Sequence, residues 1–316
     1  MWYNIFMEKY YDVIILGGGV AGMSASIYAK RKGKKVLIIE KVALGGQVSQ
    51  LSKIENFPSQ AEIDGFSLSQ KFVEQINYLN VDYVFDEVVS VDLKGIDKKV
   101  VCKNADYQAK SVVIATGLSN VELGIGENEF LGRGVSFCAV CDANFFKNKI
   151  VCVASKKGSG IADAKILANL CKKVILLDSE DMSVFEKANQ NQNIEVLSKV
   201  KIVALEGKEK LEKLVVRQQN KEKRIYTDGL FIALGKVPST KMFEGRLKLD
   251  EKGFVLTNEY MLSSIENVYA VGDVRSGVLK QIVTACSDGA IAGQQVWHYS
   301  TNLHKRYYGK AKKNRI

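Results

Sequence analysis

The sequence lacks the features that mark membrane and secreted proteins. None of its apolar runs approaches the roughly 18 residues that a membrane-spanning helix requires, so we expect no membrane association. The first residues contain no basic segment followed by an apolar segment and a cleavage site, which argues against a secretory signal. Met7 would serve as a start as well as Met1, because the first apolar strand begins near Asp12. A cytoplasmic location is the default expectation.

The sequence is also poor in metal ligands. It contains only two histidines, His298 and His304, and one C-x-x-C pair, Cys138 and Cys141. A zinc site would need two further ligands at suitable spacing, so we expect no metal centre. The remaining cysteines lie in apolar segments, where a cysteine usually acts as a small buried hydrophobic residue: Cys102, Cys152, Cys171 and Cys286. The C-x-x-C pair is therefore predicted to be a redox pair.

Acidic residues are outnumbered by basic ones, and the net charge is +10 at pH 7. Residues 301–316 carry six basic residues and no acidic one. This tail is either a solvated chain end or a docking surface for an acidic partner. Nucleic acid is not the expected partner, because no basic motif is interleaved with aromatic residues.

One local pattern occurs twice along the chain. Residues 12–40 read as an apolar strand, a glycine turn, a helix and a second strand, and residues 149–178 repeat this order. Each segment is typical of the start of a doubly wound, Rossmann-like domain. The predicted fold class is therefore α/β, with two nucleotide-binding-type domains.

The first domain is predicted to be interrupted by the second. The apolar strand and helix that follow residue 264 make sense only as a return to the first sheet. The first domain then comprises residues 1–118 and 244–316, and residues 119–243 form the inserted domain. Two crossing strands, near 117–119 and 240–245, would join the domains and permit rotation between them.

The first glycine turn has the spacing of a dinucleotide site. Gly17, Gly19 and Gly22 follow the G-x-G-x-x-G pattern between a strand and a helix, and Glu40 ends the next strand. The first glycine allows the tight turn, the second lets a pyrophosphate approach the backbone, and the third allows close helix packing. Glu40 would accept hydrogen bonds from ribose hydroxyls. The full strand–helix–strand–acid context predicts a bound dinucleotide.

Four further segments resemble the low-molecular-weight thioredoxin reductase family. They are GGQVSQLSKIENFP (45–58), IATG (114–117), GRGVSFCAVCDANFFKNK (132–149) and VYAVGDV (268–274). The resemblance covers essentially residues 10–300. It implies an FAD-dependent enzyme that reduces thioredoxin, and a homodimer.

The resemblance also implies which residues contact FAD. They come from the glycine turn, the strand ends and the start of the last helix: Gly17, Gly19, Ala21, Gly22, Glu40, Lys41, Gly46, Gln47, Asn56, Ala115, Thr116, Gly117, Gly272, Asp273, Lys280, Gln281 and Ile282. Lys280 stands where the family usually has arginine, so it keeps the charge but loses the forked geometry.

The redox pair takes its roles from the same resemblance. Cys141 is implied to be the flavin-side cysteine, which forms the charge-transfer thiolate. Cys138 is implied to be the interchange cysteine that attacks the substrate disulfide. Asp142 is implied to be the acid and base that protonates a leaving thiolate.

The second nucleotide site departs from the family pattern. Ser155 and Lys157 stand where the family has the two critical glycines of its NADPH-binding turn. Residues 178–181, DSED, replace a cluster of one histidine and two arginines. Side chains in the turn would block a pyrophosphate, and acids would repel a 2′-phosphate. We therefore expect NADPH to bind weakly.

Three other interpretations of this second site stay open. Asp178 could bind the ribose of NADH, Lys156 and Lys157 could hold a phosphate, and Gly158 with Gly160 could form a shifted turn. Without a pyridine nucleotide, the pattern resembles that of the ferredoxin-dependent flavin thioredoxin reductases. The basic net charge favours reduced ferredoxin or flavodoxin as donor, because both are acidic. The alternatives are an NAD(P)H-dependent reductase with a divergent site and an FAD-dependent dithiol oxidase that uses oxygen.

Overall fold

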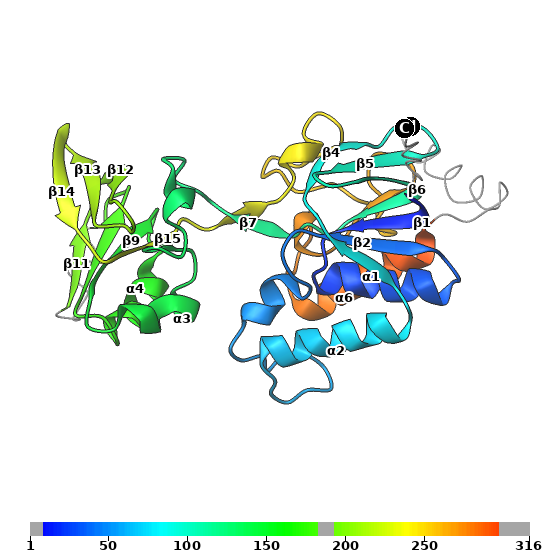
Figure 1. Cartoon of the computed structure of the whole chain (residues 1–316), viewed down its shortest axis with the longest axis horizontal. Coiled ribbons are helices and arrows are strands. Elements are labelled where there is room, and N and C mark those ends of the chain that lie inside the picture. Colours follow the sequence, from blue (N-terminus) through cyan, green and yellow to red (C-terminus); the bar gives the residue numbers. More distant parts are fainter. Residues whose placement is uncertain (1–8, 183–192, 297–316) are drawn as a thin grey trace, which may run out of the picture. The chain divides into compact units, whose positions relative to one another are not determined.

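The computed structural model describes residues 9–182 and 193–296, which fold into two compact units (Figure 1). Unit 1 comprises Met1–Leu118 and Pro238–Ile316, and unit 2 comprises Ser119–Val237. This division falls at 118/119 and 237/238, and the sequence placed the domain boundaries at 118/119 and 243/244. The basic tail and both histidines lie outside the described residues.

The strand at the point of return also differs from the prediction. The two connecting strands, β7 (Leu118–Asn120) and β16 (Lys236–Pro238), pair as a two-stranded sheet. The segment predicted as the second crossing strand, 240–245, instead contains a short 3₁₀ helix, η4 (Lys241–Phe243). The side chain of Phe243 is fully buried in the core of unit 1, and this burial assigns the segment to that unit.

Unit 1 is built on a seven-stranded sheet with the order β3-β2-β1-β6-β5-β4, in which β17 also pairs with β6. Its strands are β1 (Lys9–Leu16), β2 (Val36–Glu40), β3 (Asp82–Phe85), β4 (Val88–Asp92), β5 (Lys98–Cys102), β6 (Asp106–Ile114) and β17 (Val268–Ala270). Strands β1, β2, β3, β6 and β17 are parallel, whereas β4 and β5 form an antiparallel extension. The carboxyl ends of the parallel strands therefore meet at one edge of the sheet.

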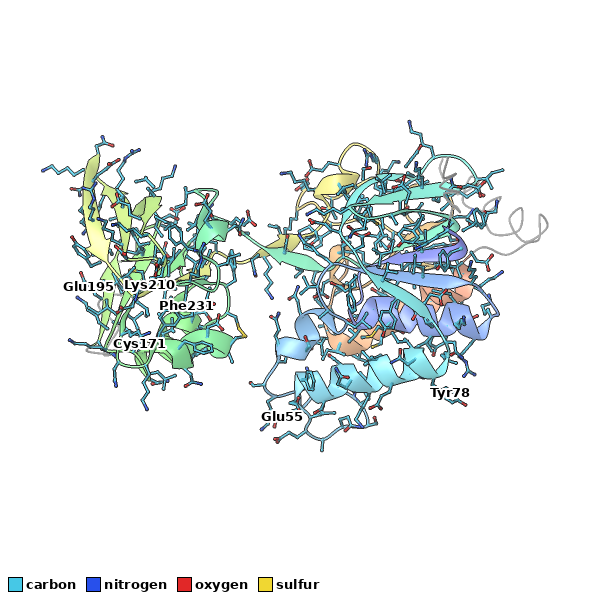
Figure 2. All side chains as sticks on the ribbon, in the orientation of Figure 1. Glu55, Tyr78, Cys171, Glu195, Lys210 and Phe231 are labelled. Carbon is cyan, nitrogen blue, oxygen red and sulfur yellow. A yellow bond between two sulfur atoms is a disulfide. The ribbon has the colours of Figure 1, made fainter. Side chains whose placement is uncertain are left out.

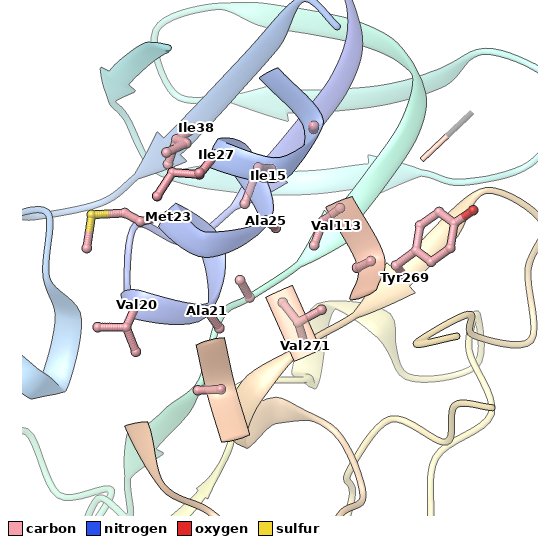
Figure 3. Packing of buried hydrophobic residues seen from close by; sticks show 14 of the residues in the cluster. Ile15, Val20, Ala21, Met23, Ala25, Ile27, Ile38, Val113, Tyr269 and Val271 are labelled. Carbon is pink, nitrogen blue, oxygen red and sulfur yellow. The ribbon is translucent and has the colours of Figure 1, made fainter. Parts of the chain in front are cut away.

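The helices of unit 1 are α1 (Val20–Arg31), α2 (Gly65–Tyr78) and α6 (Ile282–Gln295), with short 3₁₀ helices η1 (Gly46–Gln50) and η5 (Gly272–Val274). Helices α1 and α6 pack against each other through small residues, and Figure 3 shows the apolar cluster around α1. A Cβ atom added at Gly289 would lie 2.3 Å from the carbonyl oxygen of Ala21. One added at Gly293 would lie 2.5 Å from that of Ala25, so glycine is required at both positions.

Unit 2 contains a second nucleotide-binding-type sheet with the order β11-β10-β9-β15-β8. Its strands are β8 (Val135–Ser136), β9 (Ile150–Ser155), β10 (Lys173–Asp178), β11 (Ile194–Leu197) and β15 (Gly229–Ala233). Strands β9 and β10 are almost fully buried, as expected for central strands of a parallel sheet. Two such sheets confirm the predicted α/β fold class.

The other elements of unit 2 are helices α3 (Ala139–Asp142) and α4 (Ile161–Ala168), 3₁₀ helices η2 (Glu127–Phe130) and η3 (Ala143–Phe146), and strands β12 (Lys201–Glu206), β13 (Lys213–Gln218) and β14 (Lys221–Tyr226). Strands β12, β13 and β14 form an antiparallel sheet. Charged side chains such as Glu195 and Lys210 are exposed on this unit, while Phe231 is buried (Figure 2). Across the part of the chain that the structure describes, no helix is both long and apolar enough to cross a membrane.

The contact between α1 and α6 yields a stability prediction. In Gly289→Ala, the new methyl group would meet backbone atoms of α1, so the helices must separate and unfolding should become easier by about 1–3 kcal/mol. We expect a lower urea midpoint by circular dichroism. Gly277→Ala is the control, because its Cβ would meet only the end of the Arg275 side chain at 3.4 Å. Equal losses in both variants would contradict this explanation.

Candidate active site

The first candidate site is the glycine turn between β1 and α1. Gly17 has φ +106°, and a Cβ atom there would lie 2.4 Å from the carbonyl oxygen of Ala115. A Cβ atom at Gly22 would lie 2.1 Å from the carbonyl oxygen of Gly17. These two glycines are thus required by the close packing of the turn itself.

Gly19 differs from these two glycines, because a Cβ atom there would meet nothing within 4 Å. It is the N-cap of α1, and no side chain caps this helix end. The N–H groups of the first helical turn therefore have no capping side chain and suit an anion. A Cβ atom at Gly46, on the neighbouring segment, would lie 3.1 Å from Cα of Gly19, so the two glycines form the walls of a narrow cradle.

A buried polar atom next to this cradle lacks a partner. Within residues 9–182 and 193–296, Ser69 Oγ is buried without a hydrogen bond. It lies behind Gly45, where a Cβ atom would be 2.9 Å from it. The open helix end and the facing glycines Gly19 and Gly46 together fit a polar ligand such as a dinucleotide.

Glu40 lies where a ribose-binding acid is expected. Its Oε2 accepts a hydrogen bond from the N–H of Gly18 at 2.7 Å, and its Oε1 accepts one from Val42 at 2.9 Å. The carboxylate is therefore fixed beside the glycine turn. The next residue, Lys41, forms an ion pair with Glu87 at 2.7 Å.

The other predicted contact residues of unit 1 follow the ends of parallel strands or lie on adjacent segments. Residues 115–117 directly follow β6, and Gly272 with Asp273 follows β17, which pairs with β6. Thr116 Oγ1 donates to the carbonyl of Ser239 at 2.9 Å.

Two of the predicted amide side chains are held by the protein. Gln47 Nε2 donates to the carbonyl of Leu118, and Asn56 Nδ2 donates to Gln281 Oε1, both at 2.9 Å. Gln281 is also the N-cap of α6, which starts at Ile282. The fold thus brings the long 45–58 segment to the start of the last helix.

Lys280 contacts the backbone of the strand-end segment. Its Nζ donates to the carbonyls of Asp273 at 2.9 Å and Arg275 at 3.0 Å, and it lies 4.1 Å from the centre of the Phe254 ring. Burial lowers the pKa of this amine. In this structure Lys280 supports the segment that follows β17.

Sequence reasoning missed an ion pair that supports the same segment. Asp288 Oδ2 accepts hydrogen bonds from the N–H of Gly272 at 3.1 Å and from Arg275 Nη1 at 3.2 Å. Arg275 Nε in turn donates to Thr257 Oγ1 at 2.8 Å. The sequence signal for this ion pair was Asp288, an acidic residue within a mostly apolar helical stretch.

The second candidate site is the redox pair in unit 2. Cys138 and Cys141 form a disulfide at the start of α3, where Cys138 is the N-cap. Cys138 Sγ accepts a hydrogen bond from the N–H of Cys141 at 3.1 Å. Cys141 is exposed and Cys138 is half-buried, so a partner molecule can reach the disulfide.

Asp142 lies beside the disulfide and is hydrogen-bonded to a residue that sequence reasoning missed. Its Oδ2 accepts a hydrogen bond from Ser136 Oγ at 2.6 Å. Its backbone N–H donates to the carbonyl of Cys138 at 3.2 Å. The structure therefore brings the predicted acid and the predicted interchange cysteine together.

The four remaining cysteines are unsuited to thiol exchange. Burial raises the pKa of Cys102 and Cys152 to about 12 and that of Cys286 to about 11, and it also raises the pKa of Cys171. Thiols with such pKa values stay protonated at neutral pH and react slowly. No group of three potential metal ligands occurs among the residues that the structure describes.

The second turn, between β9 and α4, is closed by the protein itself. Asp178 ends β10 and is fully buried. Its Oδ2 accepts hydrogen bonds from Ser155 Oγ at 2.6 Å and from the N–H of Gly158 at 2.8 Å. Its Oδ1 accepts from the N–H groups of Lys157 at 3.1 Å and Glu180 at 2.8 Å.

The N–H groups of Lys157 and Gly158 in this turn are therefore already used. Burial alone would raise the pKa of Asp178, but the hydrogen bonds from Ser155, Glu180, Gly158 and Lys157 hold it below its usual value. The N–H of Gly160 donates to Ser155 Oγ at 3.0 Å. A carboxylate of the chain thus holds the loop that precedes Gly160, the N-cap of α4.

The chain is similar to known oxidoreductases over most of its length. Residues 11–289 match the pyridine nucleotide-disulphide oxidoreductase family, and the chain belongs to it. Thioredoxin reductase of Bacillus subtilis is 37% identical over 308 residues, covering 94% of this chain and 97% of the relative. The chain is thus an oxidoreductase of the thioredoxin reductase family.

Solved structures point the same way. The thioredoxin reductase of Lactococcus lactis has a TM-score of 0.73 and 32% identity, covering 90% of this chain and 97% of that one. A ferredoxin-flavin thioredoxin reductase from Clostridium acetobutylicum has a TM-score of 0.52 and 27% identity, covering 96% and 99%. Both named types of reductase are therefore similar to this chain.

The redox pair yields a mutational prediction. In Cys138→Ser or Cys141→Ser, the disulfide cannot form, so disulfide reduction should be abolished while the flavin stays bound. Cys286→Ser is the control, because this partly buried thiol has a raised pKa and should be dispensable. Thioredoxin thiols and flavin content per chain are the measurements. Full turnover in either single variant of the pair would disprove the assignment.

The closure by Asp178 yields a prediction of pH-dependent stability. Asp178→Asn turns one acceptor oxygen into a donor, so unfolding should become easier by about 2–3 kcal/mol at neutral pH. Because the folded-state pKa lies below the unfolded value of about 3.9, this difference should persist above that pH and disappear as the pH falls below it. Urea midpoints over this pH range measure it.

Asp181→Asn is the matched control for Asp178→Asn. Asp181 is half exposed and forms an ion pair with Lys199, so its loss should cost less than about 1 kcal/mol. A cost for Asp178→Asn no larger than for this control, or independent of pH, would count against a buried, ionised Asp178.

Proposed function

We propose that this protein binds FAD in unit 1 and reduces thioredoxin through the Cys138–Cys141 pair. We further propose that reduced ferredoxin or flavodoxin, rather than NADPH, supplies the electrons. The observation that carries the donor assignment is the buried Asp178 carboxylate, which binds the N–H groups of Lys157 and Gly158 in the turn before α4 and so closes that turn. A cytoplasmic location remains the default expectation from the sequence, and a homodimer remains an expectation from the family resemblance.

The cradle around Gly19 and Gly46 fits the pyrophosphate of FAD, with Glu40 placed for the ribose hydroxyls. Asn56, Gln281 and the segment after β17 would hold the remainder of the cofactor. Bound there, FAD would supply the electron pair that reduces the disulfide between the two cysteines, and its chemistry allows uptake of these electrons one at a time.

The two cysteines then carry out thiol–disulfide exchange. Asp142 takes the proton of the Cys138 thiol, and the resulting thiolate attacks one sulfur of the thioredoxin disulfide to form a mixed disulfide. The thioredoxin thiolate that leaves receives this proton from Asp142. The Cys141 thiolate next attacks Cys138 Sγ, restores the Cys138–Cys141 disulfide and releases the second thioredoxin thiolate, which takes up a proton. One disulfide is thus reduced for each dithiol oxidised.

The closed second turn argues against both pyridine nucleotides. To bind a pyrophosphate there, the chain would have to leave the buried Asp178 carboxylate without its partners, which is costly. NADH gains nothing from Asp178, because this carboxylate already accepts four hydrogen bonds and has no exposed surface for a ribose. Glu180 and Asp181 would in addition repel the 2′-phosphate of NADPH.

The charge distribution supports an acidic protein as donor. Residues 119–237 contain 19 basic and 15 acidic residues, and the tail at 301–316 adds six further basic ones. Basic surfaces of this kind speed association with acidic electron carriers.

The donor proposal predicts the outcome of an anaerobic titration. Reduced ferredoxin should bleach the flavin absorbance of the FAD-loaded enzyme, whereas micromolar NADPH and NADH should not. The rate with ferredoxin should fall as salt rises, since exposed charges are screened over roughly 8–10 Å at 0.1–0.15 M ionic strength. Stopped-flow absorbance measures all three reactions.

Two other results would identify a different enzyme. Rapid bleaching by NADPH or NADH without response to ferredoxin would establish an NAD(P)H-dependent reductase and refute the donor proposal. Rapid turnover with oxygen and a small dithiol would assign the chain to the dithiol oxidases. If the protein shows neither bleaching by NADPH or NADH nor turnover with oxygen, it should accept electrons from ferredoxin or flavodoxin alone.

A further inference from the structure

Ser136 connects the acid and the cysteine of the redox site through one atom. It ends β8, where it pairs with Phe231 of β15, and it is only 6% exposed. Its Oγ lies 2.6 Å from Asp142 Oδ2 and 3.0 Å from the backbone nitrogen of Cys138. A longer contact of 3.3 Å reaches the carbonyl oxygen of Cys138.

The donor and acceptor capacities of the hydroxyl settle how these contacts are used. A serine hydroxyl has one hydrogen and two lone pairs. The short contact with Asp142 takes the hydrogen, because a bond to a carboxylate is stronger than one to a neutral carbonyl. One lone pair accepts the N–H of Cys138. The carboxylate is thus tied to the backbone of the cysteine that attacks the substrate.

We propose that Ser136 is a positioning residue for proton transfer by Asp142. Its hydrogen bond engages Oδ2, so that Oδ1 is the oxygen that gives up and takes back the proton. The bond also holds the carboxyl group in one rotamer at a fixed place relative to Cys138. This inference rests on the proposed acid and base role of Asp142, and it does not depend on the identity of the electron donor.

Loss of the hydroxyl should slow exchange without affecting flavin binding. A hydrogen bond to a charged group contributes about 1.5–3 kcal/mol, and positioning of an acid depends directly on such a contact. In Ser136→Ala, we expect thioredoxin reduction to slow by about 10-fold. Ser136→Thr keeps the hydroxyl and should retain most of the rate. Asp142→Asn should slow the step by about 100-fold.

A double-mutant cycle separates this role from a structural one. If Ser136 acts through Asp142, adding Ser136→Ala to Asp142→Asn should slow the reaction by less than about twofold. A structural role would give the same further loss in both backgrounds. Ser198→Ala is the matched control, because this hydroxyl of unit 2 accepts the N–H of Met182, away from the redox pair.

The experiment is a single-turnover reaction that needs no physiological donor. The FAD-loaded enzyme is reduced anaerobically with dithionite and mixed with oxidised Bacillus subtilis thioredoxin. Acid quenching and thiol alkylation then count the reduced thioredoxin with time. Flavin content and the urea midpoint are measured for every variant, so that a folding defect is recognised.

Each outcome decides the proposal. A slow Ser136→Ala, a near-normal Ser136→Thr and no further effect in the Asp142→Asn background support it. The proposal is overturned if the single variant Ser136→Ala has a normal rate while the single variant Asp142→Asn is slow. It is also overturned if Ser136→Ala slows the reaction equally in the wild-type and Asp142→Asn backgrounds. A normal rate for Asp142→Asn would instead refute the acid and base role in the proposed function. If Ser136→Thr misfolds, the double-mutant cycle of Ser136→Ala and Asp142→Asn by itself decides between a positioning and a structural role.

Discussion

The N–H groups at each strand–helix turn need acceptors, and how the two units meet this need decides what the chain can bind. In unit 1 the turn leads into α1 without a capping side chain, and Gly19 borders open space. In unit 2 the start of α4 also lacks a capping side chain, but the N–H groups of Lys157 and Gly158 in the loop before it are bound by the buried carboxylate of Asp178. The same βαβ start thus makes an open cradle in one unit and a closed turn in the other.

The closed turn affects what unit 2 needs for its stability. A buried, ionised carboxylate with four hydrogen bonds contributes to stability, whereas an open turn depends on a ligand for the same donors. The closure makes unit 2 independent of a nucleotide. Unit 2 therefore needs no bound nucleotide to keep the fold that carries the redox pair.

The redox pair depends on the same sheet for its position. Strand β8 pairs with β15 and ends at Ser136, directly before the segment that carries both cysteines. A rigid strand end fixes the hydroxyl, the hydroxyl fixes Asp142, and the short helix α3 fixes the cysteines. Precise placement of an acid and a nucleophile on rigid elements is what general acid–base chemistry requires.

Short-range patterns in the sequence determined the two βαβ starts, the glycine turn with Glu40, the C-x-x-C pair and the α/β fold class. Each depends on the spacing of residues within one strand–turn–helix segment, so local rules suffice. The sequence also indicated that the second turn is unusual, because Ser155 and Lys157 interrupt its glycine pattern.

Only the tertiary structure decided the contacts between residues that are distant in the chain. The return to unit 1 depends on the pairing of β16 with β7 and on the burial of Phe243. The closure of the second turn depends on Asp178 of the next strand, and the support of the Gly272 segment depends on Asp288. Such hydrogen bonds and packing contacts join separate elements, and no spacing rule within a single segment encodes them.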